Sequence, residues 1–491
     1  MNFQIILAFA IYLIFMMAIG FFFSKSSSNL SDYFLGGRQM GSWLTALSAQ
    51  ASDMSSWLLM GLPGAVYLNG VSSGWIAIGL GIGTYLNWLL VAKRLRKYSA
   101  VANDAITIPE YFQNRFNSEG NALKVVCAII IFVFFLVYTA SGFNAAAKLI
   151  NNVFGIEYVL ALTIGVVVIL VYTFTGGYFA VVWTDFFQGM LMFFAILIVP
   201  IVAYLTLEAD FASVIADKPG YMDIMANGTQ LYSIQSIVSD LGWGLGYFGM
   251  PHILVRFMSI KSSDLIKKSR IIAMVWVILS LIASVAVGCI GYVYLTSRGI
   301  VLEGAASETI FMELVTRVAP GFIAGVLLCA IVSAIMSTSD SQLLVTASAM
   351  TNDIYKTIFN KKATDKQLLN LSRVAVAVVA IIAYVIALDP NNTVMDLVSN
   401  AWAGFGAAFG PAMLLSLFWK RMTMNGALVG MVSGAVVVMI WNRFLADSTG
   451  IYELVPAFII SLLLIVIVSL IGKEPDKKVI EQFESVKNVE V

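Results

Sequence analysis

Apolar runs of about 20 residues recur along the whole chain, and no other feature constrains its fold as strongly. One α-helix needs about 20 apolar residues to cross a bilayer core of about 30 Å. Hydrophobic residues make up 60% of the 491 residues and charged residues only 12%, whereas about 25% of the residues of a soluble domain are charged. An α-helix also satisfies its backbone N–H and C=O groups with its own hydrogen bonds, which is necessary because the bilayer core offers no other partners. The sequence therefore predicts an all-α polytopic membrane protein.

Thirteen of these runs are expected to be transmembrane helices, with short connections and no inserted soluble domain. They cover residues 3–23, 40–67, 73–92, 124–147, 157–175, 184–206, 236–255, 271–296, 321–349, 371–388, 394–418, 425–445 and 451–472. The first run lacks a basic start and a small-residue cleavage site, so we interpret it as a retained helix rather than a signal peptide. The polar tail from Lys473 onward is expected to be loosely ordered.

Lysine and arginine gather in alternate connections, which predicts the orientation. Cytoplasmic loops of membrane proteins are enriched in these residues. If the N-terminus is outside, 24 of the 29 Lys and Arg residues lie in cytoplasmic loops or in the tail. The exceptions are Lys148, Lys218, Arg298, Arg317 and Arg443. We therefore expect an external N-terminus and a cytoplasmic C-terminus in the inner cell membrane.

Two of the spans are expected to be interrupted helices. The second carries the polar stretch "SAQASDMSS", and the seventh carries "GWGLGYFGMPHILVRF", with four glycines and a proline. Glycine costs about 1 kcal/mol and proline about 3 kcal/mol in a helix interior. Unwound backbone inside a membrane is tolerated only where it lines a cavity or is buried in protein. The breaks are five spans apart, which indicates two inverted five-helix repeats whose broken first helices form the substrate site.

A third polar stretch, "SAIMSTSDSQLL", lies in the ninth span, which faces the first broken helix in such an architecture. Its hydroxyls at Ser337 and Thr338 would lie near the break. Together with carbonyls that unwinding frees at Ala51 and Met54, they would form a cage of neutral oxygens that suits a monovalent cation. The alternative is that these hydroxyls bond only to their own helix or hold helices together.

Asp53 lies in the first break. A carboxylate at membrane depth costs at least about 2.5 kcal/mol and is functional by default. The alternative role for Asp53 is to cap the N-terminus of the second half of the broken helix. The two roles are compatible.

These stretches resemble the sodium:solute symporter family, and most closely its bacterial sodium/proline symporters, over almost the whole chain. The most specific are "ALSAQASDMSSWLLMGLPGAVYLNG" and "GWGLGYFGMPHILVRFM", supported by "TIPEYF", "GGYFAVVWTDFFQG" and "MSTSDSQLLV". The resemblance implies one outer helix, a five-plus-five inverted repeat and two further helices. The chain would then divide into an N-terminal outer helix with a cytoplasmic loop (1–39), the first repeat (40–232), the second repeat (233–422), two C-terminal helices (423–472) and a cytoplasmic tail (473–491).

The resemblance also implies the residues of a transport site. The sodium ligands would be the carbonyls of Ala51, Met54 and Ala334 and the hydroxyls of Ser337 and Thr338. Asp53 resembles a carboxylate that the family needs near the ion for binding and coupling, and Ser55 lies in the same break. The substrate pocket would be lined by Trp57, Tyr138, Trp243, Tyr247 and Pro251. Rings suit an apolar pyrrolidine and a half-helix N-terminus suits a carboxylate; plain core packing is the alternative role for the aromatic residues.

The resemblance also bears on several other polar residues, for which two roles are open. Asp185, Asp340 and Ser341 resemble a second sodium site of some family members, and the alternative for Asp340 is a salt bridge or a position facing the cytoplasm. Four basic residues near expected cytoplasmic ends either gate the protein or anchor it at the interface; they are Arg38, Lys93, His252 and Arg256. The glycines of "AWAGFGAAFGP" in the eleventh span are expected to let that helix bend as a gate.

The sequence thus predicts a secondary active transporter that couples inward sodium movement to uptake of L-proline by alternating access. The alternatives are a sodium-coupled symporter for another solute (another amino acid, a sugar, pantothenate or sialic acid) and, more remotely, a channel or a membrane sensor. One histidine and three cysteines inside apolar runs leave too few groups for catalysis, so an enzyme is disfavoured. The expected partners are the solute, co-transported sodium and the lipid bilayer, with no organic cofactor, no nucleic acid and no obligate protein partner.

Overall fold

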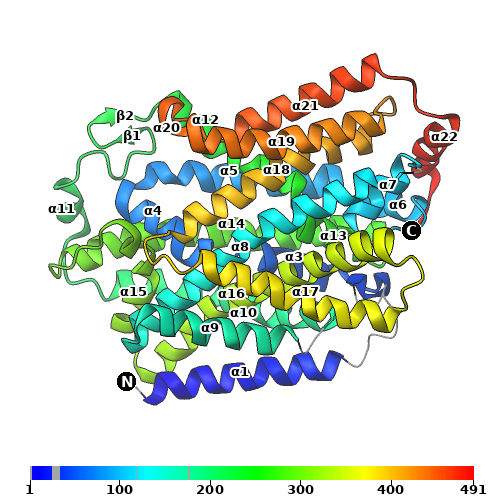
Figure 1. The fold of residues 1–491 in the computed structure, drawn as a ribbon. Helices are drawn as coiled ribbons and strands as arrows, with labels where there is room; N and C mark the ends of the chain where they lie inside the picture. The colour runs from blue at the N-terminus through cyan, green and yellow to red at the C-terminus, as the bar shows by residue number, and fades with distance from the viewer. Residues whose placement is uncertain (1–2, 25–33, 119, 175–176) are drawn as a thin grey trace.

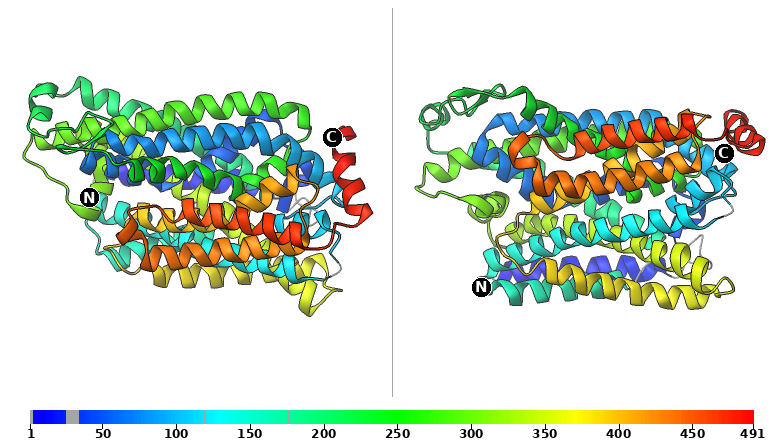
Figure 2. Two further views of the ribbon diagram at one scale, coloured as in Figure 1. Left: turned by 90° about the horizontal axis from the view of Figure 1, so that it is seen from above. Right: turned by 45° about the horizontal axis from the view of Figure 1, so that its top comes forward.

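The chain forms a bundle of long helices that run roughly along one direction (Figures 1 and 2). A computed structural model describes residues 3–24, 34–118, 120–174 and 177–491. Lys25, which the orientation argument uses, and Thr175, at the end of the expected fifth span, lie outside the described residues. Within the described ranges, ten helices are long and apolar enough to cross a membrane, and Tyr158–Thr173 is a shorter apolar helix. The all-α polytopic class is confirmed, and the count of thirteen spans stays a prediction.

The first half of the chain contains nine helices of the described residues, joined by short turns. These helices are α1 (Phe3–Ser24), α3 (Ser42–Asp53), α4 (Leu62–Asn69), α5 (Gly74–Leu86), α6 (Lys93–Val101), α7 (Ile108–Arg115), α8 (Ala122–Phe154), α9 (Tyr158–Thr173) and α10 (Tyr178–Leu205). The short helical turns are η1 (Gly36–Arg38), η2 (Trp57–Gly61), η3 (Val71–Ser73) and η4 (Asn87–Ala92). A connection with α11 (Phe211–Ala216) and the antiparallel hairpin β1 (Ala226–Asn227) and β2 (Gln230–Leu231) leads to the second half.

The second half begins with another divided helix. It comprises α12 (Ile234–Gly242), η5 (Trp243–Gly249), α13 (Pro251–Ser259), η6 (Ser263–Leu265), α14 (Ile266–Thr296), η7 (Gly304–Thr309), α15 (Ile310–Val318), α16 (Gly321–Ser348), η8 (Ala349–Phe359), α17 (Asp365–Ile386) and α18 (Val394–Phe418). The last elements are α19 (Met424–Phe444), α20 (Ala446–Thr449), α21 (Leu454–Ile471), α22 (Lys477–Ser485) and η9 (Val486–Asn488). The termini lie at opposite ends of the bundle (Figures 1 and 2).

Both expected helix breaks are present. Helix α3 ends at Asp53, because Met54 has a non-helical ψ of 73°. In the seventh span a 3-10 segment, η5, replaces α-helix between α12 and α13. Its glycines permit close packing: a Cβ on Gly246 would lie only 1.9 Å from Nε1 of Trp402. The two breaks therefore arise from different causes, a run of polar residues in α3 and a run of glycines in η5.

Helix α18 carries the glycines that are expected to let it bend as a gate. It runs unbroken from Val394 to Phe418, with a proline inside. A Cβ on Gly404 would lie 2.1 Å from Phe134, and one on Gly406 would lie 2.7 Å from the Cα of Gly246. These glycines let neighbouring segments approach α18 closely, and a role of this helix as a bending gate stays a prediction.

The tail is ordered, which corrects the expectation of a loose segment. Helix α22 lies beside α6 and α7 at one end of the bundle (Figure 1). Val479, Phe483 and Val486 are buried there. The backbone N–H of Ser263 donates to the carbonyl of Val491 over 2.6 Å. The tail thus packs against connections of both halves of the chain.

Candidate functional site

The break in α3 faces α16 in the middle of the bundle. The hydroxyl of Ser337 donates to the carbonyl of Ala51 over 2.8 Å and lies 3.4 Å from the carbonyl of Ala334. Oγ1 of Thr338, on the next residue of α16, is buried without a hydrogen-bond partner. Met54 is the residue at which α3 ends. The structure therefore brings the residues of the expected oxygen cage to one place.

Asp53 is fully buried at this break. Its Oδ2 accepts a hydrogen bond from the hydroxyl of Tyr247 over 2.7 Å, while Oδ1 has no partner. Asp53 is the last residue of α3, and the segment that follows begins at Trp57 without a side-chain cap. The alternative role as an N-cap is therefore wrong. The carboxylate points instead to η5, in the other interrupted span.

Three of the expected substrate residues surround Asp53. Nε1 of Trp57 and the hydroxyl of Tyr138 donate to the carbonyl of Asp53 over 3.1 Å and 3.4 Å, and Tyr247 bonds to its carboxylate. Pro251 begins α13 next to them, one residue before His252, whose ring centroid is 6.3 Å from that of Tyr138.

Trp243 is positioned differently from the other aromatic residues of the expected pocket. Its ring stacks on Tyr452 with centroids 5.1 Å apart. Its carbonyl accepts a hydrogen bond from Nε1 of Trp402 over 2.8 Å. Its ring thus packs on the connection that precedes α21, and its carbonyl bonds to α18.

Buried polar atoms without a partner gather around the α3 break. They are Oε1 of Gln50, Oδ1 of Asp53, the hydroxyls of Ser55, Ser56 and Thr338, and both ring nitrogens of His252. The Ser52 carbonyl faces the His252 ring, but no bond of normal geometry forms. Each unpaired buried group costs about 1–3 kcal/mol, and native proteins leave few of them. Such a cluster indicates a place that binds polar or charged species.

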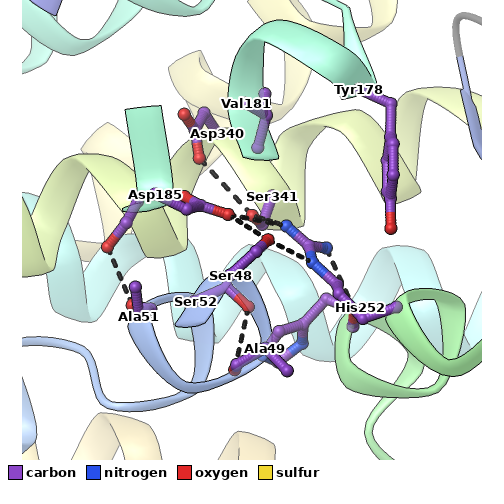
Figure 3. A network of polar contacts seen from close by, with 12 residues as sticks. Ser48, Ala49, Ala51, Ser52, Tyr178, Val181, Asp185, His252, Asp340 and Ser341 are labelled. Carbon is purple, nitrogen blue, oxygen red and sulfur yellow. Dashed lines mark hydrogen bonds and ion pairs between the residues drawn. The ribbon is translucent and has the colours of Figure 1, made fainter. Parts of the chain in front are cut away.

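A second polar network lies beside this break, and Figure 3 shows Ser48, Asp185, Asp340 and Ser341 close together in it. The hydrogen bonds of Arg256 join this network. Its guanidinium donates to Oδ2 of Asp185 over 3.1 Å and to the hydroxyl of Ser341 over 2.5 Å. It also donates to Ser48, which itself donates to Asp185 over 2.6 Å. Asp340 accepts from Ser341 over 3.5 Å, and its Oδ2 has no partner. The three residues expected at a second sodium site thus lie together, with a guanidinium among them.

Three expectations about these residues are corrected. Asp340 is buried and has no ion pair among the described residues, so it neither faces the cytoplasm nor forms a salt bridge. Arg256 and His252 are 1% and 0% exposed, so neither anchors the protein at the interface. The sequence signal that could have located Arg256 and His252 inside the bundle is the helix break that precedes α13. Because α13 begins inside the bundle at Pro251, Arg256 lies only about 8 Å further along the helix axis.

Arg38 and Lys93 lie at the end of the bundle that carries the tail. Arg38 donates to the carbonyls of Met258 and Ala105 over 2.8 and 2.9 Å and pairs with Asp104 over 2.9 Å. Burial lowers the pKa of the Arg38 guanidinium below its usual range, although Asp104 opposes that shift. Lys93 forms an exposed pair with Asp264 over 3.1 Å. Arg38 therefore ties three connections together, whereas Lys93 forms a single surface contact.

The family of the chain follows from a comparison with known proteins. The model of the sodium:solute symporter family matches residues 33–434. The chain belongs to the sodium:solute symporter family. Members of this family are transporters, and the many apolar helices make this one a multi-pass protein of the cell membrane.

Similar symporters are known from several bacteria. The chain is 47% identical over 481 residues to the osmoregulated proline transporter OpuE of Bacillus subtilis (97% of this chain, 96% of the relative). It is 46% identical to a sodium/proline symporter of Escherichia coli (97% and 95% covered) and 44% identical to one of Staphylococcus aureus (99% and 96% covered). The fold matches a substrate-bound, outward-open Na+-coupled sialic acid symporter with a TM-score of 0.80 at 19% identity, over 96% of this chain and 99% of that chain.

Proposed function

We propose that this symporter couples inward sodium movement to the uptake of L-proline by alternating access. The observation that carries the proposal is the cluster of unpaired buried oxygens beside Asp53, where α3 breaks against α16. Three relatives that are 44–47% identical are named as proline transporters, which supports proline as the solute.

Sodium would bind in the gap between α3 and α16. Its ligands would be the carbonyls of Ala51, Met54 and Ala334 and the hydroxyls of Ser337 and Thr338. Ser337 now donates its proton to the Ala51 carbonyl; on binding, this hydroxyl would rotate and present its oxygen to the ion. The described residues contain no cluster of three or more His, Cys, Asp or Glu side chains that could hold a metal, and neutral oxygens suit a weakly held monovalent ion.

Asp53 and Ser55 would couple the ion to the solute. Asp53 links the broken α3 to η5 through Tyr247, so that an ion which orders the α3 break also fixes one wall of the pocket. Trp57, Tyr138, Tyr247 and Pro251, with Trp243 further out, would enclose the pyrrolidine ring. The N-terminus of α13 carries a partial positive charge that suits the substrate carboxylate.

Coupling in this mechanism is reciprocal. If sodium tightens proline binding by some factor, proline must tighten sodium binding by the same factor. The membrane potential adds about 2.3 kcal/mol per charge for each 100 mV. One sodium ion per proline would therefore suffice for considerable accumulation.

A second sodium site at Asp185, Asp340 and Ser341 is a further part of the proposal. Two buried carboxylates and one guanidinium lie together there, and Arg256 pairs directly with Asp185, so the ionised cluster carries a net charge of −1. The unpaired oxygens on Asp185 and Asp340 are suitable ligands. Arg256 would have to withdraw from Ser341 to admit the ion.

The decisive experiment is uptake of labelled proline into proteoliposomes under an imposed sodium gradient. We expect Asp53→Asn to abolish the sodium-dependent component. Asp447→Asn, on the exposed α20, is the matched control and should transport normally. Uptake that needs no sodium and survives Asp53→Asn would overturn the mechanism.

Other solutes are tested in the same assay. Unlabelled amino acids, sugars, pantothenate and sialic acid should compete with proline weakly or not at all, and a better competitor would replace proline as the cargo. A channel would dissipate the sodium gradient without added solute. We propose that the protein has no enzymatic activity and needs neither an organic cofactor nor an obligate protein partner.

We also propose an external N-terminus and a cytoplasmic C-terminus. Contacts between loops support this orientation, because Lys-rich and Arg-rich connections meet at one end: Arg38 pairs with Asp104, Lys93 with Asp264, and Lys420 with Glu484. The excess of basic residues would place that end in the cytoplasm.

A further inference from the structure

A basic pocket lies outside the transport site, at the end of the bundle that carries the tail. The pocket has a volume of about 280 Å³. Its wall includes Leu89, Leu90, Lys93, Arg94 and Lys97 of the continuous span Val71–Val101, and Lys487 of the tail. None of these residues belongs to the sodium or substrate sites described above.

The spacing of these residues places apolar and basic side chains in sequence along one face of the helix. Positions 89, 90, 93, 94 and 97 recur at intervals of one, three and four residues, which puts them on the same side. Leu89 and Leu90 are 41% and 40% exposed on the membrane-spanning part. The basic side chains follow within about 12 Å of helix. The face therefore passes from hydrocarbon depth to headgroup depth.

Most of the positive charge in the pocket lacks a carboxylate partner. Arg94, Lys97 and Lys487 have no ion pair within the part of the chain that the structure describes. The Arg94 guanidinium lies over the ring of Phe418 at 4.8 Å, and its Nε has no hydrogen-bond partner. Of the four basic residues, Lys93 alone pairs with a described acidic residue, Asp264, and both side chains of that pair are more than half exposed. Such an exposed pair competes weakly with an incoming anion.

We propose that this pocket binds the headgroup of an anionic phospholipid. The phosphodiester would lie among Arg94 and the lysines, and an acyl chain would run along Leu89 and Leu90. Basic pockets at the cytoplasmic ends of membrane helices bind anionic headgroups through this chemistry. Free phosphate would meet the same charges but would leave the two exposed leucines unused, so the apolar part of the pocket favours the lipid. Because Lys487 comes from the tail, the lipid would also join the tail to α6.

Lipid binding is tested on the purified full-length protein in a neutral detergent. Dioleoyl-phosphatidylglycerol is titrated, and bound lipid is counted by native mass spectrometry alongside the thermal unfolding midpoint. Dioleoyl-phosphatidylcholine is the zwitterionic comparison. Inorganic phosphate and glycerol phosphate distinguish a headgroup from a free anion. We expect retention of phosphatidylglycerol and a rise in the midpoint that the other three compounds do not produce.

The variant that tests the pocket is Lys93→Gln/Lys97→Gln/Lys487→Gln, which leaves Arg94 on its aromatic neighbours. Its matched control is Lys361→Gln/Lys362→Gln/Lys366→Gln, which removes the same charge from exposed positions before and at the start of α17, at the same end. We expect the first variant to lose at least tenfold in apparent affinity for phosphatidylglycerol, and the control to change less than twofold. Unchanged affinity in the first variant, equal loss in both, or equal binding of phosphatidylcholine would overturn the proposal.

A folding defect in the first variant would be revealed by its unfolding midpoint without lipid. In that event, competition experiments on the unmodified protein test whether the site binds lipid. Bound phosphatidylglycerol that is displaced by inorganic phosphate or glycerol phosphate would contradict a lipid site, and resistance to both would support it.

Discussion

Tyr247 holds the only hydrogen bond to the Asp53 carboxylate among the described residues, over 2.7 Å. A hydrogen bond to a charged group contributes about 1.5–3 kcal/mol. If Asp53 couples sodium to the solute, Tyr247→Phe should raise the sodium concentration for half-maximal uptake by roughly tenfold or more. The measurement is proline uptake in proteoliposomes against sodium concentration.

The control for this substitution is Tyr384→Phe. Tyr384 lies on α17, away from the break, and its hydroxyl forms a hydrogen bond with the hydroxyl of Thr163 over 3.0 Å. It should leave the sodium dependence unchanged. An unchanged sodium dependence in Tyr247→Phe would mean that the hydrogen bond has no part in coupling.

Arg256 forms a buried ion pair with Asp185, so its removal should lower stability more than removal of both members of the pair. Breaking a buried ion pair costs about 3–5 kcal/mol, because the remaining charge has no partner. Arg256→Gln should lower the thermal unfolding midpoint strongly, and adding Asp185→Asn should recover part of the loss. The exposed pair Lys420→Gln/Glu484→Gln, at 3.5 Å, is the control and should change stability by at most about 1 kcal/mol. Equal losses in the single and double variants would argue against a coupled pair.

Sequence reasoning located Asp53 and failed to locate Arg256 for one physical reason. Asp53 lies in a long apolar run, so its charge stands out against the surrounding residues. Arg256 lies at the end of such a run, where charged residues normally reach the interface. Its burial depends on where α13 begins in three dimensions, and on Asp185 of α10 and Ser341 of α16, which accept its hydrogen bonds.

Glycines mark where helical elements approach each other most closely. The Cβ of Gly246→Ala would lie 1.9 Å from Nε1 of Trp402, whereas the Cβ of Gly81→Ala would have no neighbour nearer than 4.0 Å. Overpacking a buried site costs about 1–3 kcal/mol, while alanine favours a helix over glycine by about 1 kcal/mol. We expect Gly246→Ala to lower the unfolding midpoint and Gly81→Ala to keep or raise it. A similar midpoint for both variants would show that η5 and α18 can separate at little cost.

The sequence predicted both helix breaks, because polar residues and glycines disfavour α-helix wherever they lie. It also contained a signal for α22, a helical pattern of apolar residues, which is easily missed because the segment is mostly charged. Val479, Phe483 and Val486 recur at helical spacing and are buried, in a segment that is otherwise charged. The partners of that apolar stripe lie on α6 and α7, hundreds of residues earlier, so the contact itself could not be predicted from local pattern.

At the scale of the whole molecule, the distribution of charge and the arrangement of helices agree. The basic connections predicted to share one side do meet, since Arg38 reaches Ala105 and Met258 and the tail reaches Ser263. The opposite end carries α11, the β1–β2 hairpin and the N-terminal end of α1 (Figures 1 and 2). Repeat symmetry was inferred from the spacing of two breaks, and an identical spacing could have arisen by chance. The fold match to a sodium-coupled symporter supports the overall arrangement of the helices, and the division into two repeats stays a prediction.

The direction of the bundle in the membrane is open to a direct test. Single cysteines are placed at two exposed positions at opposite ends, Asn391→Cys between α17 and α18 and Lys361→Cys between η8 and α17. The three native cysteines are buried, so they should contribute little background. We expect a membrane-impermeant maleimide to label Asn391→Cys in intact cells and Lys361→Cys only after permeabilisation, because the basic end is retained in the cytoplasm. The reverse labelling would invert the orientation and place the proposed lipid pocket in the outer leaflet, whereas labelling of both in intact cells would show that charge alone does not fix this bundle in one direction.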